Sequence, residues 1–419
     1  MTNRGPARPP LGRGFARLWG SAGLSNLADG VLKTAVPLIA LQYTDAPLLL
    51  GLVAAAMSLP WLLFALLAGA IADRGDRRIL MVAANIVRAA VLAAGALAVW
   101  VDAGSVWLLA AVAFCVGSME TVYDTSAQSI VPQLVGKGDL VRANARLTTV
   151  ELTTNQFVGP PLGGVLVAAG AAVALVVPGA MWLAALLVLL AVPGSFRIAR
   201  PARTTIAADV GEGLRFLWRS TQLRTLALMV GLVSLTISAA FTVLPLFATR
   251  SGEGADVGLG LSEVGYGVLL AVSAVGGVLG ATLAAPIVRG IGRTASLTLT
   301  IASIVVLVGI GAVTEHPALV GAALAVGSAG ISIWNVITVS FRQRVTPGAL
   351  LGRVNSAYRL LAWGTMPIGA VLGGIVADAV GVQAMFAIAA GVVALAFLGL
   401  FVVNGRTMQS AEDAADGAD

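Results

Sequence analysis

Twelve long apolar stretches dominate this chain of 419 residues. A helix needs roughly 20 apolar residues to cross the ~30 Å hydrocarbon core of a bilayer, and each stretch has about that length. Barrel strands would be shorter and would alternate strictly between apolar and polar residues, which these stretches do not. The stretches cover residues 18–44, 48–72, 79–101, 105–129, 146–169, 172–193, 225–248, 262–288, 294–313, 317–340, 354–378 and 383–403. The sequence therefore predicts an all-α membrane protein with twelve transmembrane helices.

The composition supports a membrane-embedded chain and excludes several kinds of site. Apolar residues make up 58% of the sequence and charged residues only 11%, against about 25% charged residues in an ordinary soluble domain. With one cysteine, Cys115, and one histidine, His316, neither an internal disulfide nor a zinc site of Cys and His ligands can form. We expect no metal and no cofactor. The basic residues are scattered over short loops, so no nucleic-acid partner is expected.

The basic residues also predict the orientation of the chain in the membrane. An even number of spans leaves both termini on one side. Most of the 26 lysines and arginines fall in loops on that side, and Arg250 is the one basic residue in a loop on the other side. Lys33, Arg88 and Arg359 lie inside expected spans. By the positive-inside rule, both termini face the cytoplasm.

Two segments about half a chain length apart resemble each other. Each runs from R-x-N to L-G-G, one starting at Arg142 and the other at Arg353, so the fifth and eleventh spans correspond. Six spans is an even number, so the two units lie the same way up and are related by a pseudo-two-fold axis along the membrane normal. The predicted parts are an N-terminal arm (1–17), a six-helix bundle (18–193), a linker (194–224), a second six-helix bundle (225–403) and a disordered cytoplasmic tail (404–419).

The linker contains the phrase E-G-L-R-F-L-W-R-S-T-Q-L-R. Val210, Leu214, Leu217 and Trp218 fall on one helical face with arginines around them, which is typical of a short helix at a membrane surface. An unstructured tether fits the same spacing. Both readings stay open at the level of sequence.

The connection between the second and third spans concentrates charge in G-A-I-A-D-R-G-D-R-R. It resembles the signature loop of the major facilitator superfamily, with Asp76 where that family usually has glycine. The resemblance implies a cytoplasmic latch between the halves, in which Asp73 lies near the start of the eleventh span, around Gly352 to Ser356. The alternative is a solvated loop whose arginines merely follow the positive-inside rule. The latch residues are Gly69, Asp73, Arg74, Arg77 and Arg78.

A second motif, N-Q-F-V-G-P-P-L-G-G over residues 155–164, lies in the fifth span. It resembles the G-P-x-x-G-G signature of proton-driven antiporters in the same superfamily. Glycines leave a groove for a neighbouring helix, and prolines remove backbone donors and weaken the helix, which predicts a hinge. Ordinary packing of small residues is the alternative. The hinge residues are Gly159, Pro160, Pro161, Gly163 and Gly164.

Further phrases extend the resemblance over nearly the whole chain. N-L-A-D-G-V-L-K-T-A-V-P in the first span and E-T-V-Y-D-T-S-A-Q-S-I-V-P at the end of the fourth are similar to the bacterial efflux branch that includes enterobactin exporters and macrolide or multidrug efflux pumps. This implies a monomeric transporter of the bacterial inner membrane. It would use alternating access and the proton gradient to export drugs, antibiotics or siderophore-like compounds in exchange for protons.

Several charged residues fall inside spans of the N-terminal half, where an ionised side chain costs at least ~2.5–3.5 kcal/mol. Asp29 and Lys33 lie four residues apart on one helical face and could neutralise one another. Glu120 and Asp124 have the same spacing but the same charge, so each disfavours ionisation of the other. Carboxylates in such a setting are suited to exchanging protons.

Arg88 lies too deep in the third span to reach water and needs an acidic partner. Glu120 or Glu151 is the expected partner. We predict that the N-terminal half carries proton coupling, while a fixed ion-pair network that only joins helices is the alternative. The intramembrane charges concerned are Asp29, Lys33, Arg88, Glu120, Asp124 and Glu151.

Aromatic, methionine and amide side chains in the spans are candidates for a substrate cavity, because large adaptable side chains can repack around different hydrophobic compounds. In so apolar a chain, fewer than half of them should line a pathway. The candidates are Asn155, Tyr123, Met119, Asn335, Trp334 and Trp363, followed by Met57, Trp61, Phe64, Phe114, Phe241 and Tyr358.

Other functions fit the sequence less well. A symporter or uniporter of a small polar metabolite would need more hydrogen-bonding groups in the C-terminal half. An enzyme is not expected, because neither H-E-x-x-H nor G-x-S-x-G occurs, and ATP-driven transport lacks its G-x-x-x-x-G-K-[ST] motif. A channel stays possible and would be recognised by large continuous currents.

Overall fold

The computed structural model describes residues 11–194, 196, 206–251 and 258–416. Over these ranges the regular structure is helical. The first part of the chain forms α1 (Arg13–Ala40), α2 (Pro47–Arg74), α3 (Arg77–Trp100), α4 (Val106–Leu134), η1 (Lys137–Asp139), α5 (Leu140–Glu151), η2 (Leu152–Val158), α6 (Gly159–Ala169) and α7 (Ala171–Leu190). The second part forms α8 (Ile206–Arg219), α9 (Thr221–Thr249), α10 (Glu263–Gly309), η4 (Ile310–Ala312), α11 (Pro317–Val345), α12 (Gly348–Val380), α13 (Val382–Ala394), η5 (Leu395–Phe401) and α14 (Gly405–Asp416).

Nine helices within the described ranges are long and apolar enough to cross a membrane. Helix α10 is counted once but covers two of the expected spans. These two spans are separated at Gly292, whose φ of 81° is not helical. The first expected span is α1, whose hydropathy is lowered by Asp29 and Lys33. The fifth is divided among α5, η2 and α6, so no single piece of it is long enough. Each expected span is therefore helical over most of its length in the described structure.

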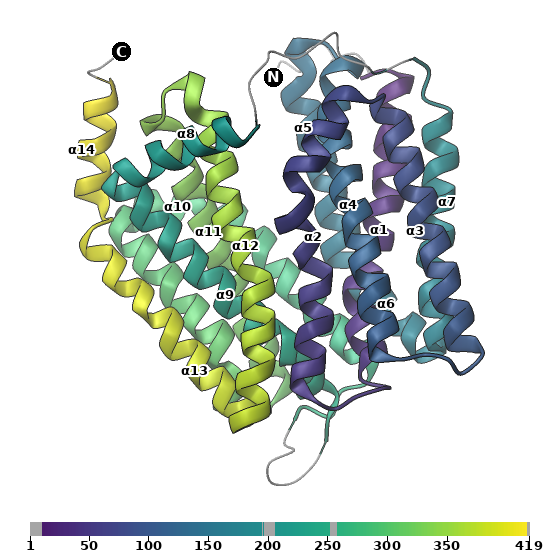
Figure 1. The fold of residues 1–419 in the computed structure, drawn as a ribbon. Coiled ribbons are helices and arrows are strands. Elements are labelled where there is room, and N and C mark those ends of the chain that lie inside the picture. Colours follow the sequence, from purple (N-terminus) through teal and green to yellow (C-terminus); the bar gives the residue numbers. More distant parts are fainter. Residues whose placement is uncertain (1–10, 195, 197–205, 252–257, 417–419) are drawn as a thin grey trace, which may run out of the picture.

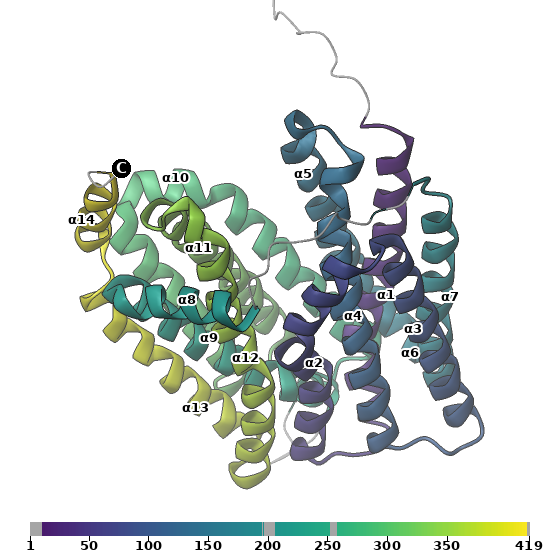
Figure 2. The ribbon, with the colours of Figure 1, turned by 45° about the horizontal axis from the view of Figure 1, so that its top comes forward.

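Helices α1–α7 form one group and α9–α13 a second, referred to below as the N-terminal and C-terminal groups (Figure 1). Contacts between the groups are made chiefly by α2 with α12 and by α6 with α10. The groups converge at the end opposite the start of α1, and Figure 2 shows α5 and α8 on opposite sides at the other end. We call the convergent end the far end and the end that carries α5, α8 and α14 the near end.

Glycines allow the two groups to meet backbone to backbone at the far end. A Cβ atom at Gly374 of α12 would lie 2.6 Å from the carbonyl oxygen of Pro47 and 3.0 Å from the Cα of Leu48, both in α2. A Cβ at Gly267 of α10 would lie 2.8 Å from the Cα of Pro161 in α6. No larger residue fits at these crossings without separating the helices.

An ion pair also joins the groups at the far end. Nη2 of Arg250, which follows α9, lies 2.9 Å from Oδ1 of Asp45, in the connection between α1 and α2. Arg250 is the one basic residue that the sequence analysis assigned to a loop on this side of the membrane. Asp45 is 74% exposed, so the pair contributes at most about 1 kcal/mol and acts mainly as a cross-link that can be opened.

Residues 206–219 of the linker form the helix α8, in agreement with one of the two sequence interpretations. On the predicted apolar face of α8, Leu217 is fully buried, whereas Leu214 and Trp218 are exposed. The side chain of Val210 lies outside the described residues. Glu212 of α8 forms an ion pair with Arg353 of α12, which fixes this helix against the C-terminal group.

The expectation of a disordered tail is wrong for residues 405–416, which form α14. Both carboxylate oxygens of Glu412 contact the guanidinium of Arg293 in α10, at 3.0 and 3.1 Å, and Oε2 lies 3.4 Å from Nη1 of Arg344 in α11. Met408 is fully buried in the core of the C-terminal group. Acidic composition alone suggested disorder, but buried contacts with two helices stabilise the segment.

Replacing Glu412 by glutamine should destabilise the docking of α14. Glu412 is 4% exposed, and its loss leaves two arginines without their carboxylate, at an expected cost of about 1–3 kcal/mol. Thermal unfolding of the purified protein should begin at a lower temperature. Asp413→Asn is the matched control, because Asp413 is exposed and, among the described residues, its carboxylate accepts a hydrogen bond from Gln409 of its own helix alone. Equal melting curves for the two variants would contradict the clamp.

Candidate functional site

A cavity of about 540 Å³ lies between the two groups of helices. Its wall comes mostly from the N-terminal group, with α1, α2, α3, α4, α5 and η2 each contributing residues. Of the described residues in the C-terminal group, Trp363 and Met366 line the cavity, both from α12. The residues that line the cavity are Asn26, Asp29, Leu32, Lys33, Val36, Met57, Ser58, Trp61, Leu92, Val112, Ala113, Val116, Gly117, Glu120, Asp124, Gln128, Glu151, Asn155, Gln156, Trp363 and Met366.

Behind this wall, Arg88 of α3 pairs with Asp29 of α1. Their closest atoms, Nη1 and Oδ1, are 3.5 Å apart, and the side chains are 0% and 6% exposed. The guanidinium of Arg88 lies 5.4 Å from the ring centroid of Tyr123 and 4.8 Å from that of Trp182, and it donates to Ser25 at 3.4 Å. Flat aromatic faces thus stabilise a cation that has no access to water.

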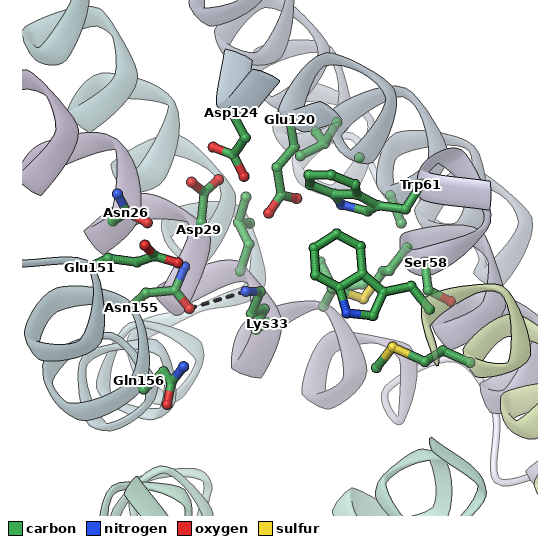
Figure 3. A pocket seen from close by; sticks show the side chains of 18 of the residues that line it. Asn26, Asp29, Lys33, Ser58, Trp61, Glu120, Asp124, Glu151, Asn155 and Gln156 are labelled. Carbon is green, nitrogen blue, oxygen red and sulfur yellow. Dashed lines mark hydrogen bonds between the residues drawn. The ribbon is translucent and has the colours of Figure 1, made fainter. Parts of the chain in front are cut away.

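One expected pairing is wrong. Arg88 was expected to pair with Glu120 or Glu151, but the side chain turns towards α1 and pairs with Asp29. Lys33 lies close enough to Asp29 for its charge to act on that carboxylate, while its Nζ donates to Oδ1 of Asn155 in η2 at 3.1 Å (Figure 3). The i, i+4 spacing placed Asp29 and Lys33 on one face correctly, but partners supplied by neighbouring helices took precedence.

Three further carboxylates face the cavity, those of Glu120, Asp124 and Glu151. No lysine or arginine in the described part of the chain forms an ion pair with any of them. Figure 3 shows the carboxylates of Asp29, Glu120 and Asp124 directed towards a common space. Asp124 lies close enough to Glu120 and Asp29 for their charges to act on one another. This side of the cavity therefore has an excess of negative charge.

Two tryptophans form an aromatic wall. The ring centroids of Trp61 in α2 and Trp363 in α12 are 5.0 Å apart, with an interplanar angle of 79°. This edge-to-face contact joins the two groups of helices inside the cavity. The guanidinium of Arg359 lies 5.5 Å from the ring centroid of Trp363, so this arginine rests on an aromatic face. Met57 and Met366 add flexible apolar surface.

The π-helix η2 supplies Asn155 to the cavity. Pro160 and Pro161 follow it after Gly159, and neither can donate a backbone hydrogen bond to the preceding turn. The chain accommodates these missing donors by widening over Leu152–Val158, where Gly159 N donates to the carbonyl of Thr154, five residues earlier. Local sequence thus determines how Asn155 is presented to Lys33.

The glycines of the expected hinge lie at close helix contacts. A Cβ at Gly159 would lie 2.7 Å from the Cα of Gly30 in α1, and one at Gly163 would lie 2.7 Å from the carbonyl oxygen of Val31. Gly164 approaches the backbone of Glu263 in α10 in the same way. The motif therefore positions α6 against both groups of helices. Bending at this motif stays a prediction.

Four of the six preferred cavity candidates do not line the cavity, so those predictions are wrong for this structure. Met119 and Tyr123 lie in or against a core cluster beside Arg88, and Trp334 is buried in the core of the C-terminal group. Asn335 is exposed on α11. Asn155 and Trp363 line the cavity as expected, and so do Met57 and Trp61 among the further candidates. Phe64, Phe114, Phe241 and Tyr358 do not line it.

Sequence reasoning missed several polar lining residues. Gln128 follows Glu120 and Asp124 at intervals of four residues, so helical spacing could have found it. Asn26 precedes Asp29 by three residues on the same face of α1. Ser58 and Gln156 had no comparable signal, because their direction depends on the packing of α2 and on the π-helix.

The signature loop is held by its own half of the molecule. Asp76 caps α3 by accepting from the backbone of Arg78 at 3.0 Å and also accepts from the backbone of Phe196 at 3.1 Å. Arg77 is buried, and Arg78 donates to the carbonyl of Val192 after α7. The side chain of Asp73 lies outside the described residues. A Cβ at Gly69 would meet none of the described atoms within 4 Å, and the latch stays a prediction.

Comparison with known proteins gives consistent results. Residues 6–417 match the profile of a family described as transmembrane secretion effector. The chain is 31% identical over 400 residues to the multidrug efflux pump Tap of Mycolicibacterium fortuitum, covering 92% of each chain. It is 23% identical over 383 residues to macrolide efflux protein A of Streptococcus pyogenes, covering 89% of this chain and 91% of that protein.

Solved structures show the same fold. The nucleoside transporter NupG matches with a TM-score of 0.74 at 14% identity, over 94% of this chain and 100% of that one. A bacterial homologue of the iron transporter ferroportin, in an inward-facing state, matches with a TM-score of 0.73 at 17% identity, over 93% and 98%. At these identities the likeness concerns the arrangement of helices.

Proposed function

Because this chain belongs to the transmembrane secretion effector family of the major facilitator superfamily, we propose that it exports hydrophobic small molecules in exchange for protons. It is a membrane transporter and not an enzyme. Its similarity to multidrug and macrolide efflux proteins supports drugs and antibiotics as substrates. The proton gradient would supply the energy, and no cofactor is needed in this scheme.

In this proposal the chain crosses the membrane twelve times as two six-helix bundles related by an axis along the membrane normal. Support comes from the division of α10 at Gly292 and from the continuous path of α5, η2 and α6 through the expected fifth span. The excess of basic residues in loops on one side of the membrane would place both termini, and thus the near end, in the cytoplasm of a bacterial cell.

In this proposal, the conformation seen in the structure is one state of an alternating-access cycle. The crossing at Gly374 and the ion pair between Asp45 and Arg250 join the groups at the far end. At the near end, a Cβ at Gly69 or at Gly352 would meet no described atom within 4 Å, so the two sides of the proposed latch have room for a later contact. The cavity would therefore open towards the cytoplasm here, and closure of the near end would expose it to the outside.

The observation that carries the proton-exchange proposal is the group of carboxylates in the cavity wall. Asp29, Glu120, Asp124 and Glu151 lie where a substrate would bind, and only Asp29 has an ion-pair partner in the described structure. Carboxylates that share a low-dielectric site can hold a proton between them and release it when the surroundings change. A proton released towards the cytoplasm would leave the site ready for the next substrate.

Transport into inverted membrane vesicles tests this proposal. A pH gradient with the acid side inside the vesicles should drive uptake of a fluorescent drug. Glu120→Gln or Asp124→Asn should lower that uptake by at least about a hundredfold, because a positioned group that transfers a proton typically contributes about 10²–10⁴-fold to a rate. Glu315→Gln is the control, because Glu315 is an exposed residue outside the cavity that contacts Gln383. Unchanged gradient-driven uptake in both cavity variants would contradict proton exchange through these residues.

The alternative of a polar-metabolite symporter is less well supported by the cavity. Such a substrate needs hydrogen-bonding groups on both sides, whereas the described residues of the C-terminal group contribute an indole and a thioether side chain. A panel of drugs and siderophores tested in an efflux-deficient host, with and without an uncoupler, separates the two functions. Protection by this chain that the uncoupler abolishes is the expected result.

A further inference from the structure

We propose that the substrate is an organic cation with an aromatic or otherwise flat apolar body. This rests on the proposed export function and narrows it, because drugs, antibiotics and siderophore-like compounds differ in the sign of their charge. The choice follows from the polarity of the two opposite walls of the cavity.

The first wall carries more negative than positive charge. Four carboxylates line the cavity, against one ammonium group, that of Lys33. Arg88 compensates Asp29 from behind, and Lys33 is directed to the amide of Asn155. Glu120 and Asp124 are left facing the cavity with no cationic partner in the described residues. A concave site with low-dielectric walls concentrates such a field, so it attracts cations and repels anions.

The second wall consists of aromatic side chains and flexible apolar side chains. Trp61 and Trp363 meet edge to face, which leaves indole surface turned to the cavity, and Met57 and Met366 lie beside them. Indole faces bind flat apolar groups and also attract cations. Arg359 already uses the ring of Trp363 in this way, with 5.5 Å between guanidinium and centroid.

The two walls together define the ligand. A cationic nitrogen or phosphonium centre would lie towards Glu120 and Asp124, while its apolar substituents would rest on Trp61 and Trp363. In Figure 3 the labelled Trp61 and the carboxylate of Glu120 face the same space. The cavity volume of about 540 Å³ is within the range usual for sites that take drug-sized molecules.

An anionic substrate would meet the opposite conditions. A catecholate or carboxylate chelator would bring negative charge against Glu120, Asp124 and Glu151, and among the described lining residues Lys33 alone is cationic. Like charges at close range cost several kcal/mol in an interface of this kind. A siderophore-like compound is therefore the least suitable of the three substrate types.

The proposal can be tested with two ions of nearly identical shape and opposite charge, tetraphenylphosphonium and tetraphenylborate. Binding to purified protein is measured by equilibrium dialysis against protein-free micelles of the same detergent, which corrects for partition into the detergent and removes any membrane potential. We expect the cation to bind at least about tenfold more tightly than the anion. Equal binding, or tighter binding of the anion, overturns the proposal.

Matched variants locate the binding within the cavity. Glu120→Gln and Trp61→Ala should each weaken tetraphenylphosphonium binding about tenfold, through loss of charge and of aromatic surface respectively. Glu315→Gln and Trp107→Ala are the controls, since Glu315 is exposed and Trp107 is 65% exposed on the outside of α4. Equal losses in the control variants would contradict binding at this site.

Transport measurements distinguish failure of this inference from failure of the proposed function. Gradient-driven uptake of anionic or neutral drugs, together with no selective binding of the cation, would leave export intact and overturn the substrate class. Selective binding of the cation without any gradient-driven uptake would overturn proton-driven export but keep the preference of the cavity.

Discussion

Replacing Gly374 by valine should abolish transport. A Cβ at this position would lie 2.6 Å from the carbonyl oxygen of Pro47, and the valine methyl groups would extend further into α2. Because the obstacle is backbone, the overlap is relieved only by separating α2 from α12, at a cost of at least about 2 kcal/mol. A bias of that size changes the ratio of far-end-closed to far-end-open molecules by at least about 30-fold, so the cycle should stop with the far end open.

Accessibility of one introduced cysteine measures that shift. In a Cys115→Ser background, Ser58→Cys places a thiol in the cavity wall. A membrane-impermeant maleimide should label it from the near end in the parent protein and from the far end when Gly374→Val is added. Gly391→Val is the matched control, because a Cβ at Gly391 of α13 would meet nothing within 4 Å. Normal transport by Gly374→Val would show that α2 and α12 need not touch during the cycle.

Removing the guanidinium of Arg88 should be as damaging, but through stability. Arg88→Met leaves Asp29 buried without its counter-charge, and breaking a buried ion pair from one side costs about 3–5 kcal/mol. Most of the protein should then fail to reach the folded state, as measured by size-exclusion chromatography of the solubilised membrane fraction. Arg359→Met should fold normally, since Arg359 is exposed and pairs with no carboxylate in the described part of the chain.

A double substitution separates the structural role of this pair from its role in transport. Arg88→Met combined with Asp29→Asn leaves no buried charge, so the yield of folded protein should recover. Gradient-driven uptake should stay low if Asp29 takes part in proton exchange. Recovery of both folding and uptake would restrict Asp29 and Arg88 to holding α1 against α3.

The sequence predicted the parts of this molecule that follow from the cost of placing groups in a bilayer. Spans of about 20 apolar residues are imposed by its thickness, and charges such as Glu120 and Asp124 had to face a polar interior. The expected positions of Asp29 and Lys33 in the cavity wall follow from the same reasoning.

The structure adds features that depend on contacts distant in sequence. Helical spacing gives the face on which Asp29 lies, but the partner is set by how α3 packs against α1. Trp334 is a large aromatic residue of the kind expected in a drug-binding cavity, yet it packs into the core of the C-terminal group. The order of α14 depends on arginines more than 60 residues away along the chain, Arg344 being 68 residues from Glu412. None of these choices is encoded in local spacing.

The π-helix before Gly159 lets one membrane helix meet two requirements that a regular helix could not meet together. Asn155 must face Lys33, and the glycines that follow must face the helices against which they pack. Each residue advances a helix by about 100°, so the wider turn offsets the azimuth of Asn155 from that of the glycine face below it. Deleting one residue from this turn would restore a regular helix and rotate one half against the other. The amide of Asn155 and the glycines of α6 could then no longer both face the groups that they contact now. The π-helix therefore allows the residue that lines the cavity and the glycines that pack against other helices to keep different orientations.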